Sequence, residues 1–165
     1  MTALINFSLF QYKCIETKKD GATFTFKTDK NQVKKIIKDF FDFLKEFTKS
    51  KNIMKDFPRE QTHFHPIKNL EKRDLILKIF QKFGYKSEFI DQYLGDSPNI
   101  WQIKTNSEIR LFFLKEDKVQ GIENYCIIKP LFLDINHAIY NEKQIAKNFN
   151  ICLICWEKRC VNTIS

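Results

Sequence analysis

The sequence predicts a single α+β domain, in which an N-terminal β-hairpin and helices are followed by an antiparallel β-meander. The 165 residues have the length of one domain. Apolar residues recur at three- and four-residue steps before Pro98 and at every second residue after it, which are the periods of a helix and of a strand. With 43% hydrophobic residues, the chain has enough apolar side chains for a packed core. The single domain has three parts: 1–66 with the hairpin, a helix and a histidine-containing loop, 67–140 with helices and the antiparallel sheet, and 141–165 with a cysteine-containing segment.

The first part contains the hairpin and the most regular helix. Asp20-Gly21 is a typical two-residue hairpin turn, and the weakly alternating segments 7–14 and 22–27 flank it. The helix that follows has its lysines mostly opposite an apolar stripe. That stripe consists of Val33, Ile36, Ile37, Phe40, Phe41, Leu44 and Phe47.

Residues 49–68 break the helical pattern, and they include a histidine-containing stretch, 57–66, with a proline near each end. We expect a second helix to begin near Asn69 and to end at Gly84, because glycine is a common helix stop. A short third helix is expected over 88–94.

The C-terminal half has the two-residue period of strands. The expected elements are strands over 99–105 and 108–114, a polar loop over 115–121, one long strand or two over 122–135, a short helix beginning at Asn141, and a last strand over 151–156. Pro130 lacks the backbone N–H that a central strand donates, so we expect a bulge or an edge position there.

The composition excludes several classes of protein. Four isolated glycines cannot form the glycine-rich phosphate loop of a P-loop or dinucleotide-binding enzyme. No apolar run approaches the roughly 20 residues that span a bilayer, and the N-terminus does not resemble a secretion signal. We therefore expect a cytoplasmic protein without a membrane partner. In that compartment the five cysteines favour a metal site or free thiols over disulfide bonds.

Lysine supplies most of the formal net charge of +8. The chain is also rich in Ile, Asn and Phe, a bias that an AT-rich genome produces whatever the function. Two explanations stay open: a surplus selected for an anionic partner such as nucleic acid, and a solvated lysine surface.

His137 follows an apolar strand, and Tyr140 lies three residues further along. Polar side chains at the end of a strand can line a cleft, and an imidazole titrates at about pH 6.5. A histidine beside Arg110 or Arg59 suits general acid and base catalysis on a phosphodiester. The alternative is that each histidine caps a turn or bonds a nearby carbonyl group.

Arg110 interrupts an otherwise apolar strand, and Arg59 lies in the histidine-containing stretch. Arg110 must either form an ion pair or be presented to an anion such as a phosphate. Aromatic residues beside basic ones, as in 24–27 and 110–113, are typical of single-stranded nucleic-acid binding. With 17 phenylalanines, core packing is the alternative explanation for this pattern.

Cys152 and Cys155 have the CxxC spacing of half a structural zinc site. His63 and His65 alternate, so in an extended segment both imidazoles point the same way. The four side chains would form a Cys2His2 site that joins the C-terminus to the central loop, and Cys160 can replace one ligand. The alternative is that these cysteines are small hydrophobic residues of a strand.

Residues from about 70 to 140 resemble the RelE/ParE-like toxin family. The matching pattern is 100–104, a turn, 109–113, a polar loop, and a strand that ends at His137 and Tyr140. The resemblance implies helices followed by a compact antiparallel sheet. Family members with ribonuclease activity cut messenger RNA on the ribosome with basic and polar groups displayed on that sheet.

The resemblance also implies roles for four residues. Arg110 would contact a phosphate, Lys104 would be an auxiliary charge, and His137 and Tyr140 would be catalytic groups at the strand end. We therefore expect an RNA-cleaving, toxin-like or phage-defence ribonuclease that uses the substrate's own 2′-OH as nucleophile. Its partners would be RNA or a nucleic-acid-containing complex, and a protein antitoxin or inhibitor. Two alternatives stay open: a non-catalytic phage or mobile-element protein that binds a nucleic acid or a nucleic-acid machine, and a zinc-stapled interaction domain.

Overall fold

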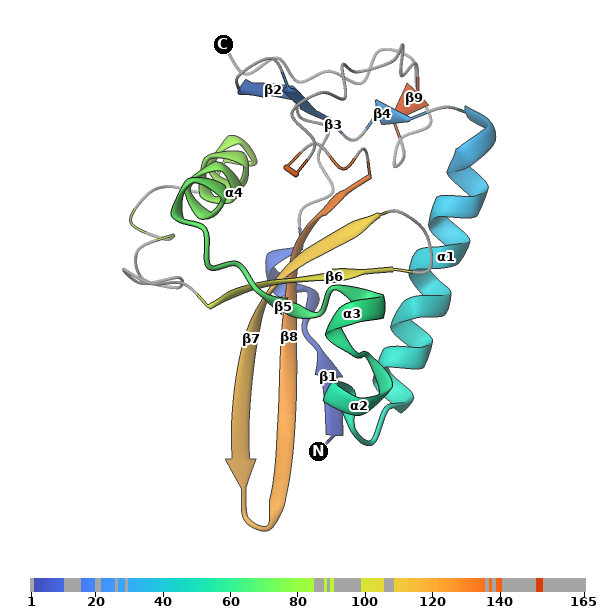
Figure 1. Ribbon diagram of the computed structural model, residues 1–165, viewed down its shortest axis with the longest axis vertical. Helices are drawn as coiled ribbons and strands as arrows, with labels where there is room; N and C mark the ends of the chain where they lie inside the picture. Colours follow the sequence, from blue (N-terminus) through green and yellow to red (C-terminus); the bar gives the residue numbers. More distant parts are fainter. Residues whose placement is uncertain are drawn as a thin grey trace.

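The computed structural model describes residues 2–10, 16–19, 22–25, 27–28, 30–84, 88, 90, 99–105, 109–135, 137, 139–140 and 151–152. Helices and one larger sheet make up this part of the chain, so the predicted α+β class is confirmed (Figure 1). Within these residues no helix has both the length and the apolar character that a membrane span requires.

A five-stranded sheet forms the centre of the described structure. In spatial order its strands are β1 (Thr2–Ile5), β8 (Glu123–Asp134), β7 (Arg110–Gln120), β6 (Ile100–Lys104) and β5 (His65–Pro66). The strands from β5 to β8 pair antiparallel, as expected for the meander. β1 is parallel to β8, with Thr2 opposite Tyr125, which makes the sheet mixed. The sequence predicts no strand at this position, because four residues are too few for a period to show.

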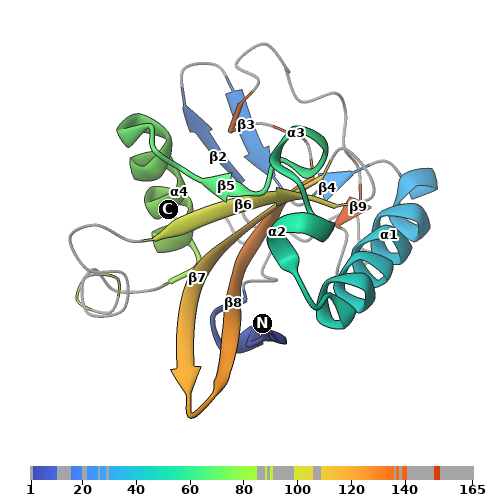
Figure 2. The ribbon, with the colours of Figure 1, turned by 60° about the horizontal axis from the view of Figure 1, so that its bottom comes forward.

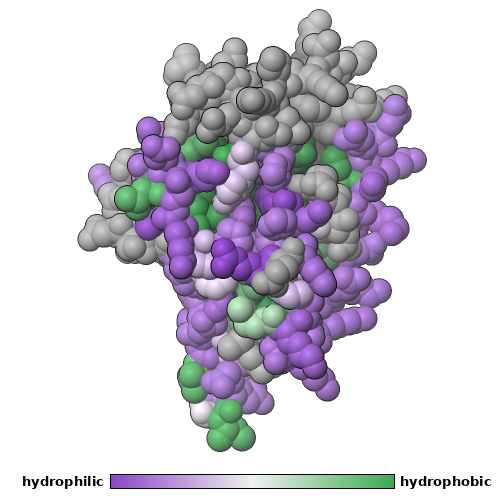
Figure 3. All heavy atoms as spheres, in the orientation of Figure 1, coloured by the Kyte–Doolittle hydropathy of each residue, from purple (hydrophilic) through white to green (hydrophobic). Residues whose placement is uncertain are grey.

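β7 and β8 extend beyond β6 as a long arm (Figure 1), in which β1 pairs with β8 as far as Tyr125 and the tip is two-stranded. β6 pairs with β7 only as far as Leu114, whereas β8 pairs with it as far as Gln120. The expected polar loop over 115–121 is therefore wrong, because 115–120 continue the strand. These residues are polar because much of the arm is exposed, and cross-strand ion pairs such as Lys129–Glu116 join its strands. On the face shown in Figure 3, hydrophobic side chains gather at the tip of the arm.

A β-bulge at Pro130 confirms the irregularity expected in this strand. Phe112 lies opposite Phe132, whereas the next residue, Phe113, lies opposite Pro130, so Leu131 is the additional residue. Proline has no N–H to donate to a neighbouring strand, and the bulge accommodates it.

Two longer helices confirm the helices expected from the apolar period. α1 (Lys30–Lys49) buries most of its apolar stripe. α4 (Leu70–Lys82) begins after Asn69, whose side-chain oxygen accepts a hydrogen bond from the Lys72 backbone N–H at 2.9 Å. It ends before Gly84, which has a φ of +93° that few other residues adopt.

The two helices contact opposite faces of the sheet (Figure 2). Phe47 of α1 contacts Phe64, which stacks on Phe113 with 6.0 Å between ring centroids. Phe83, directly after α4, contacts Phe132 at the same centroid distance of 6.0 Å. Phe132 lies opposite the neighbour of Phe113 in β7, and successive residues of a strand point to opposite faces. The sheet is therefore covered on both sides.

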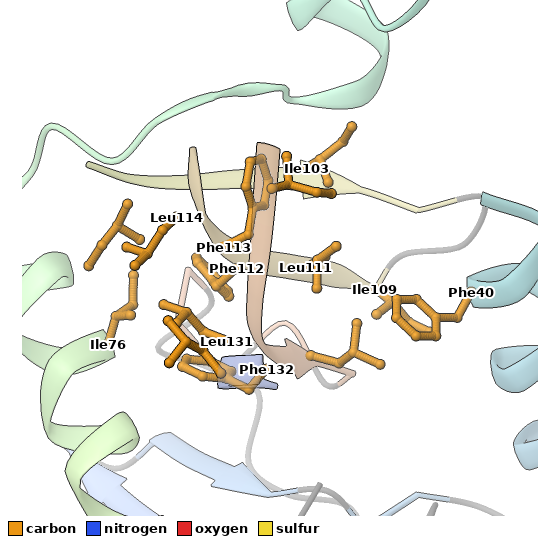
Figure 4. Packing of buried hydrophobic residues seen from close by; sticks show 14 of the residues in the cluster. Phe40, Ile76, Ile103, Ile109, Leu111, Phe112, Phe113, Leu114, Leu131 and Phe132 are labelled. Atoms are coloured by element: carbon orange, nitrogen blue, oxygen red, sulfur yellow. The ribbon is translucent and has the colours of Figure 1, made fainter. Parts of the chain in front are cut away.

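The core lies between these layers, and Figure 4 shows part of it around β7 and β8. Phe112 and Phe113 are fully buried, so neither ring is free to stack on a nucleic-acid base. For the segment 110–113, core packing is therefore the correct one of the two explanations offered by the sequence.

The segment 49–68, expected to be irregular, contains two single-turn helices and an edge strand. The helices are α2 (Ile53–Asp56), capped by Asn52, and α3 (Arg59–Thr62), which begins after Pro58. Such short helices escape prediction because one turn carries no apolar period. The chain then passes through β5 into α4 along one edge of the sheet (Figure 1).

The remaining short elements lie in the first part of the chain. They are the 3-10 helix η1 (Phe7–Leu9), the antiparallel pair β2 (Glu16–Lys19) and β3 (Ala22–Thr25), and β4 (Lys27–Thr28) paired with β9 (Ile151–Cys152). The prediction of a strand over 7–14 is wrong for its first three residues, because they form the 3-10 helix η1. Lys19 lies opposite Ala22, so β3 pairs with 16–19 across the two residues of the expected turn. The helices expected over 88–94 and from Asn141 lie outside the described residues, apart from 88 and 90.

Candidate functional site: a cationic pocket beside Tyr140

A pocket of about 430 Å³ opens where α2, α3, β5, β6 and the start of α4 come together. The side chains that decide its chemistry are Arg59, His65, Lys68, Lys72, Trp101 and Tyr140. Its volume is within the range of about 300–1,000 Å³ that is usual for small-molecule sites. The described residues that line the pocket include three cations and no carboxylate, so the pocket suits an anion.

The three cations come from two separate parts of the chain. Arg59 is the first residue of α3, while Lys68 precedes α4 and Lys72 lies in its first turn. In the described part of the chain none of them takes part in an ion pair, and Arg59 and Lys68 are exposed. The exposed charges of Arg59 and Lys68 are therefore accessible to a ligand.

Lys72 also contacts Tyr140. Its Nζ atom lies 3.9 Å from the centroid of the Tyr140 ring, which is the geometry of a cation–π interaction. The Asn69 cap fixes where α4 begins and thus where Lys72 projects. The contact therefore restricts the positions of the Lys72 and Tyr140 side chains at one wall of the pocket.

The Tyr140 hydroxyl remains protonated at neutral pH. The pKa of Tyr140 is raised to about 12, mainly by burial, while the charge of Arg110 acts to lower it and the charge of Asp134 acts to raise it. A phenol in this state donates a hydrogen bond and can give up a proton, but it is not a base. Tyr140 is therefore suited to donate to an anionic oxygen in the pocket.

His137 lies beside Tyr140, as the sequence predicts. The two ring centroids are 6.0 Å apart, and His137 is half-buried. Its φ of +56° is unusual for a residue other than glycine. His137 does not line the pocket itself, so it can act only on a group that extends past Tyr140.

Arg110 and Asp134 do not line the pocket, but their charges act on Tyr140. Arg110 is 5% exposed, Asp134 is fully buried, and the two residues are directly opposite in the register of β7 and β8. One oxygen of Asp134 accepts a hydrogen bond from the Ile139 N–H at 3.0 Å, which fixes the chain just before Tyr140. Arg110 thus acts on the site through its charge. A direct contact between Arg110 and a phosphate stays a prediction, and this burial does not favour it.

Lys104 lies opposite Arg110 on β6 and is half-buried, but it does not line the pocket. The sequence therefore locates one pocket cation, Arg59, and misses Lys68 and Lys72. An Asn cap three residues before Lys72 is the one local signal for them, and it specifies a helix start rather than a pocket.

His65 lines the pocket with both ring nitrogens engaged. The Nδ1 atom lies 3.0 Å from the Pro66 carbonyl oxygen, to which it donates, and Nε2 accepts from the Gln102 amide at 2.8 Å. With the imidazole proton on Nδ1, these two partners use both ring nitrogens. In this arrangement His65 has no lone pair free for a metal ion or for a proton from a substrate.

The four residues proposed to bind zinc are only partly described. His63 ends α3 with a φ of +53°, Cys152 lies in β9 opposite Lys27, and Cys155 is outside the described residues. Among the residues that the structure does describe, no group of three or more His, Cys, Asp or Glu side chains is placed to hold a metal ion. The zinc site stays a prediction, and the engaged ring of His65 argues against His65 as a ligand.

Cys126 is a buried free cysteine. Burial raises its pKa to about 11, and the charge of Lys115 lowers it only in part. Since the thiolate is the reactive form of cysteine, Cys126 is a structural residue and not a nucleophile.

One comparison with known proteins identifies the family of the chain. The model of a family described as "Uncharacterised protein UU032" matches residues 12–159. The chain belongs to the UU032 family. Comparison with curated proteins and with solved structures gives no match.

Proposed function

We propose that the protein binds RNA at the cationic pocket and cleaves a neighbouring phosphodiester bond at the edge of the pocket, beside Tyr140 and His137, by acid and base catalysis. One observation carries the proposal: Arg59, Lys68 and Lys72 line a pocket together with aromatic rings and without a described carboxylate. Phosphate groups are attracted by such cations, and bases stack on aromatic side chains. The partly exposed aromatic rings of the pocket are those of Trp101 and Tyr140.

The chemistry uses the 2′-OH of the substrate as the nucleophile. His137 takes the proton of that hydroxyl as its oxygen forms a bond to phosphorus. Tyr140, protonated because of its raised pKa, gives a proton to the 5′-oxygen as the bond from phosphorus to that oxygen breaks. Lys72, in contact with the Tyr140 ring, balances the charge on the phosphate. The products are a 2′,3′-cyclic phosphate and a 5′-hydroxyl, and exchange with water restores both side chains.

The biological setting remains part of the proposal. The resemblance to RelE/ParE-like toxins suggests a toxin-like or phage-defence ribonuclease with a protein antitoxin or inhibitor as partner, and the match to the UU032 family does not bear on it.

The second candidate function is RNA binding without cleavage. It is favoured by the engaged ring of His65 and by the burial of Arg110, because neither group is then presented to a substrate. A binding site needs only the cations and the aromatic rings.

A cleavage assay separates the two candidates. Purified protein is incubated with end-labelled single-stranded RNA, and with the same RNA made with 2′-deoxy nucleotides. We expect fragments that end in 2′,3′-cyclic phosphate from the RNA and none from the deoxy strand. RNA that is bound but intact would replace the proposal with the second candidate, and RNA that is not bound would reject both.

The matched variants are His137→Asn and His63→Asn. Both positions have a positive φ, which asparagine tolerates. The two substitutions should therefore have similar effects on the backbone. Loss of the base should slow cleavage by about 100-fold in His137→Asn, while His63→Asn should cleave like the wild type. Equal rates in the two variants would remove His137 from the mechanism.

A further inference from the structure

We propose that the pocket recognises the end of an RNA strand that carries a terminal phosphate, in preference to an internal phosphodiester. This inference rests on the proposed function, because it names which part of the RNA enters the pocket. It is argued from the charge, the size and the aromatic wall of the pocket.

The charge of the pocket exceeds what one phosphodiester needs. An internal phosphodiester carries a single negative charge, whereas a terminal phosphate carries about −1.5 to −2 at neutral pH. Three cations line the pocket, and no ion pair in the described part of the chain neutralises them. The first turn of α4, which includes Lys72, adds the positive end of a helix dipole on the same side. The doubly charged group is the better electrostatic match.

The cations approach from two directions. Arg59 lies on α3, and Lys68 and Lys72 flank the start of α4 after the intervening strand β5. A terminal phosphate offers three free oxygens to these cations, whereas a phosphodiester offers two. Arginine adds the ability to bind two of these oxygens at once.

The size and the wall of the pocket suit a single nucleotide. A volume of about 430 Å³ is near the lower end of the range for small-molecule sites. The half-buried Trp101 forms an aromatic wall, and the buried Phe64 packs against it with 5.0 Å between their ring centroids. The Trp101 indole N–H donates a hydrogen bond to the Asn99 side-chain oxygen at 2.7 Å, which fixes the plane of the ring. The terminal base can stack there while its phosphate lies among the cations.

The experiment measures Trp101 fluorescence. The chain has two tryptophans, so Trp156→Phe leaves Trp101 as the reporter. This protein is titrated with one short 2′-O-methyl RNA, which lacks the nucleophile and is not cleaved, in three forms: with a 5′-phosphate, with a 3′-phosphate, and with hydroxyls at both ends. We expect one phosphorylated RNA to bind at least about 10-fold more tightly than the RNA with hydroxyls at both ends. Comparison of the 5′-phosphate and 3′-phosphate forms then identifies which end of the strand the pocket recognises.

Two variants show whether the pocket is responsible. Lys68→Met should reduce the preference for the phosphorylated end to less than about 2-fold, whereas Lys35→Met, on the exposed side of α1, should preserve it. Equal binding of all three RNA forms would overturn the terminal-phosphate inference and leave the proposed function standing. No binding of any form would overturn both.

Discussion

Arg110 and Asp134 lie directly opposite each other in β7 and β8, and both side chains are buried. Directly opposed residues of antiparallel strands point to the same face of the sheet. Two opposite charges are therefore placed together at the sheet end that carries His137 and Tyr140. Of the two roles that the sequence leaves open for Arg110, this relationship favours the ion pair. The Arg110 side chain is 5% exposed, and its contact with a phosphate stays a prediction.

The first prediction is that Arg110 and Asp134 are energetically coupled. Arg110→Met leaves a buried carboxylate unbalanced, and Asp134→Asn leaves a buried guanidinium unbalanced. Each should lower the free energy of unfolding by about 3 kcal/mol, and the double variant should lose clearly less than the sum. Urea denaturation measures all three. Lys118→Met, which removes an exposed charge from the arm, serves as the control and should unfold like the wild type. Additive losses would show that the two charges do not interact.

The second prediction concerns the ionisation of Tyr140. Its pKa is about 12 in the folded protein and about 10 in an unfolded chain. The protonated phenol is therefore favoured by folding. Its contribution to stability is complete below about pH 10 and is lost as the pH rises to about 12. The difference between the tyrosinate absorbance titrations of the wild type and of Tyr140→Phe should have its midpoint near pH 12. A midpoint near pH 10 would contradict the burial of the hydroxyl group.

The third prediction assigns the Tyr140 hydroxyl to the chemical step. Tyr140→Phe keeps the ring that Lys72 contacts and removes the proton donor. We expect kcat for RNA cleavage to fall by about 100-fold, with KM changed by less than about 3-fold. Tyr125→Phe is the matched control, because its hydroxyl bonds Glu123 on the arm, and it should keep both constants. An unchanged kcat in Tyr140→Phe would show that its hydroxyl takes no part in catalysis.

The fourth prediction concerns zinc. The sequence predicts a structural ion on Cys152, Cys155, His63 and His65, whereas His65 uses both ring nitrogens within the protein. If zinc is bound, its stoichiometry should therefore be the same in the wild type and in His65→Gln, and elemental analysis of both purified proteins measures it. Zinc that is present in the wild type and lost from His65→Gln would restore the original Cys2His2 set. A content near zero in the wild type would reject the zinc site.

The sequence predicts those parts of the fold that depend on local patterns. The period of apolar residues predicts α1 and α4, and the missing N–H of Pro130 predicts the bulge. The arm is missed because its exposed strands carry polar residues, which resemble those of a loop. The parallel pairing of β1 is missed because it joins segments more than 100 residues apart in the sequence.

In the candidate site, too, features that depend on neighbouring residues can be predicted from the sequence, whereas long-range contacts cannot. His137 and Tyr140 are three residues apart, so their proximity can be predicted from the sequence alone. The contact between Lys72 and Tyr140 joins α4 to the end of the sheet, and no local pattern specifies it. The burial of Arg110 depends likewise on its partner in β8, because a lone arginine in an apolar strand is compatible with either an ion pair or a ligand.

The central claim is that the cationic pocket, rather than the overall charge of +8, binds RNA. Two triple variants with the same net charge test it. One changes Arg59, Lys68 and Lys72 to alanine, and the other changes Lys34, Lys35 and Lys45, which lie exposed on α1.

The measurement is the affinity of both variants and the wild type for fluorescently labelled single-stranded RNA, by anisotropy at one fixed salt concentration. We predict that the pocket variant loses at least about 10-fold in affinity and that the α1 variant stays within about 2-fold of the wild type. Equal losses in the two variants would show that binding follows total charge, and would contradict the assignment of the pocket.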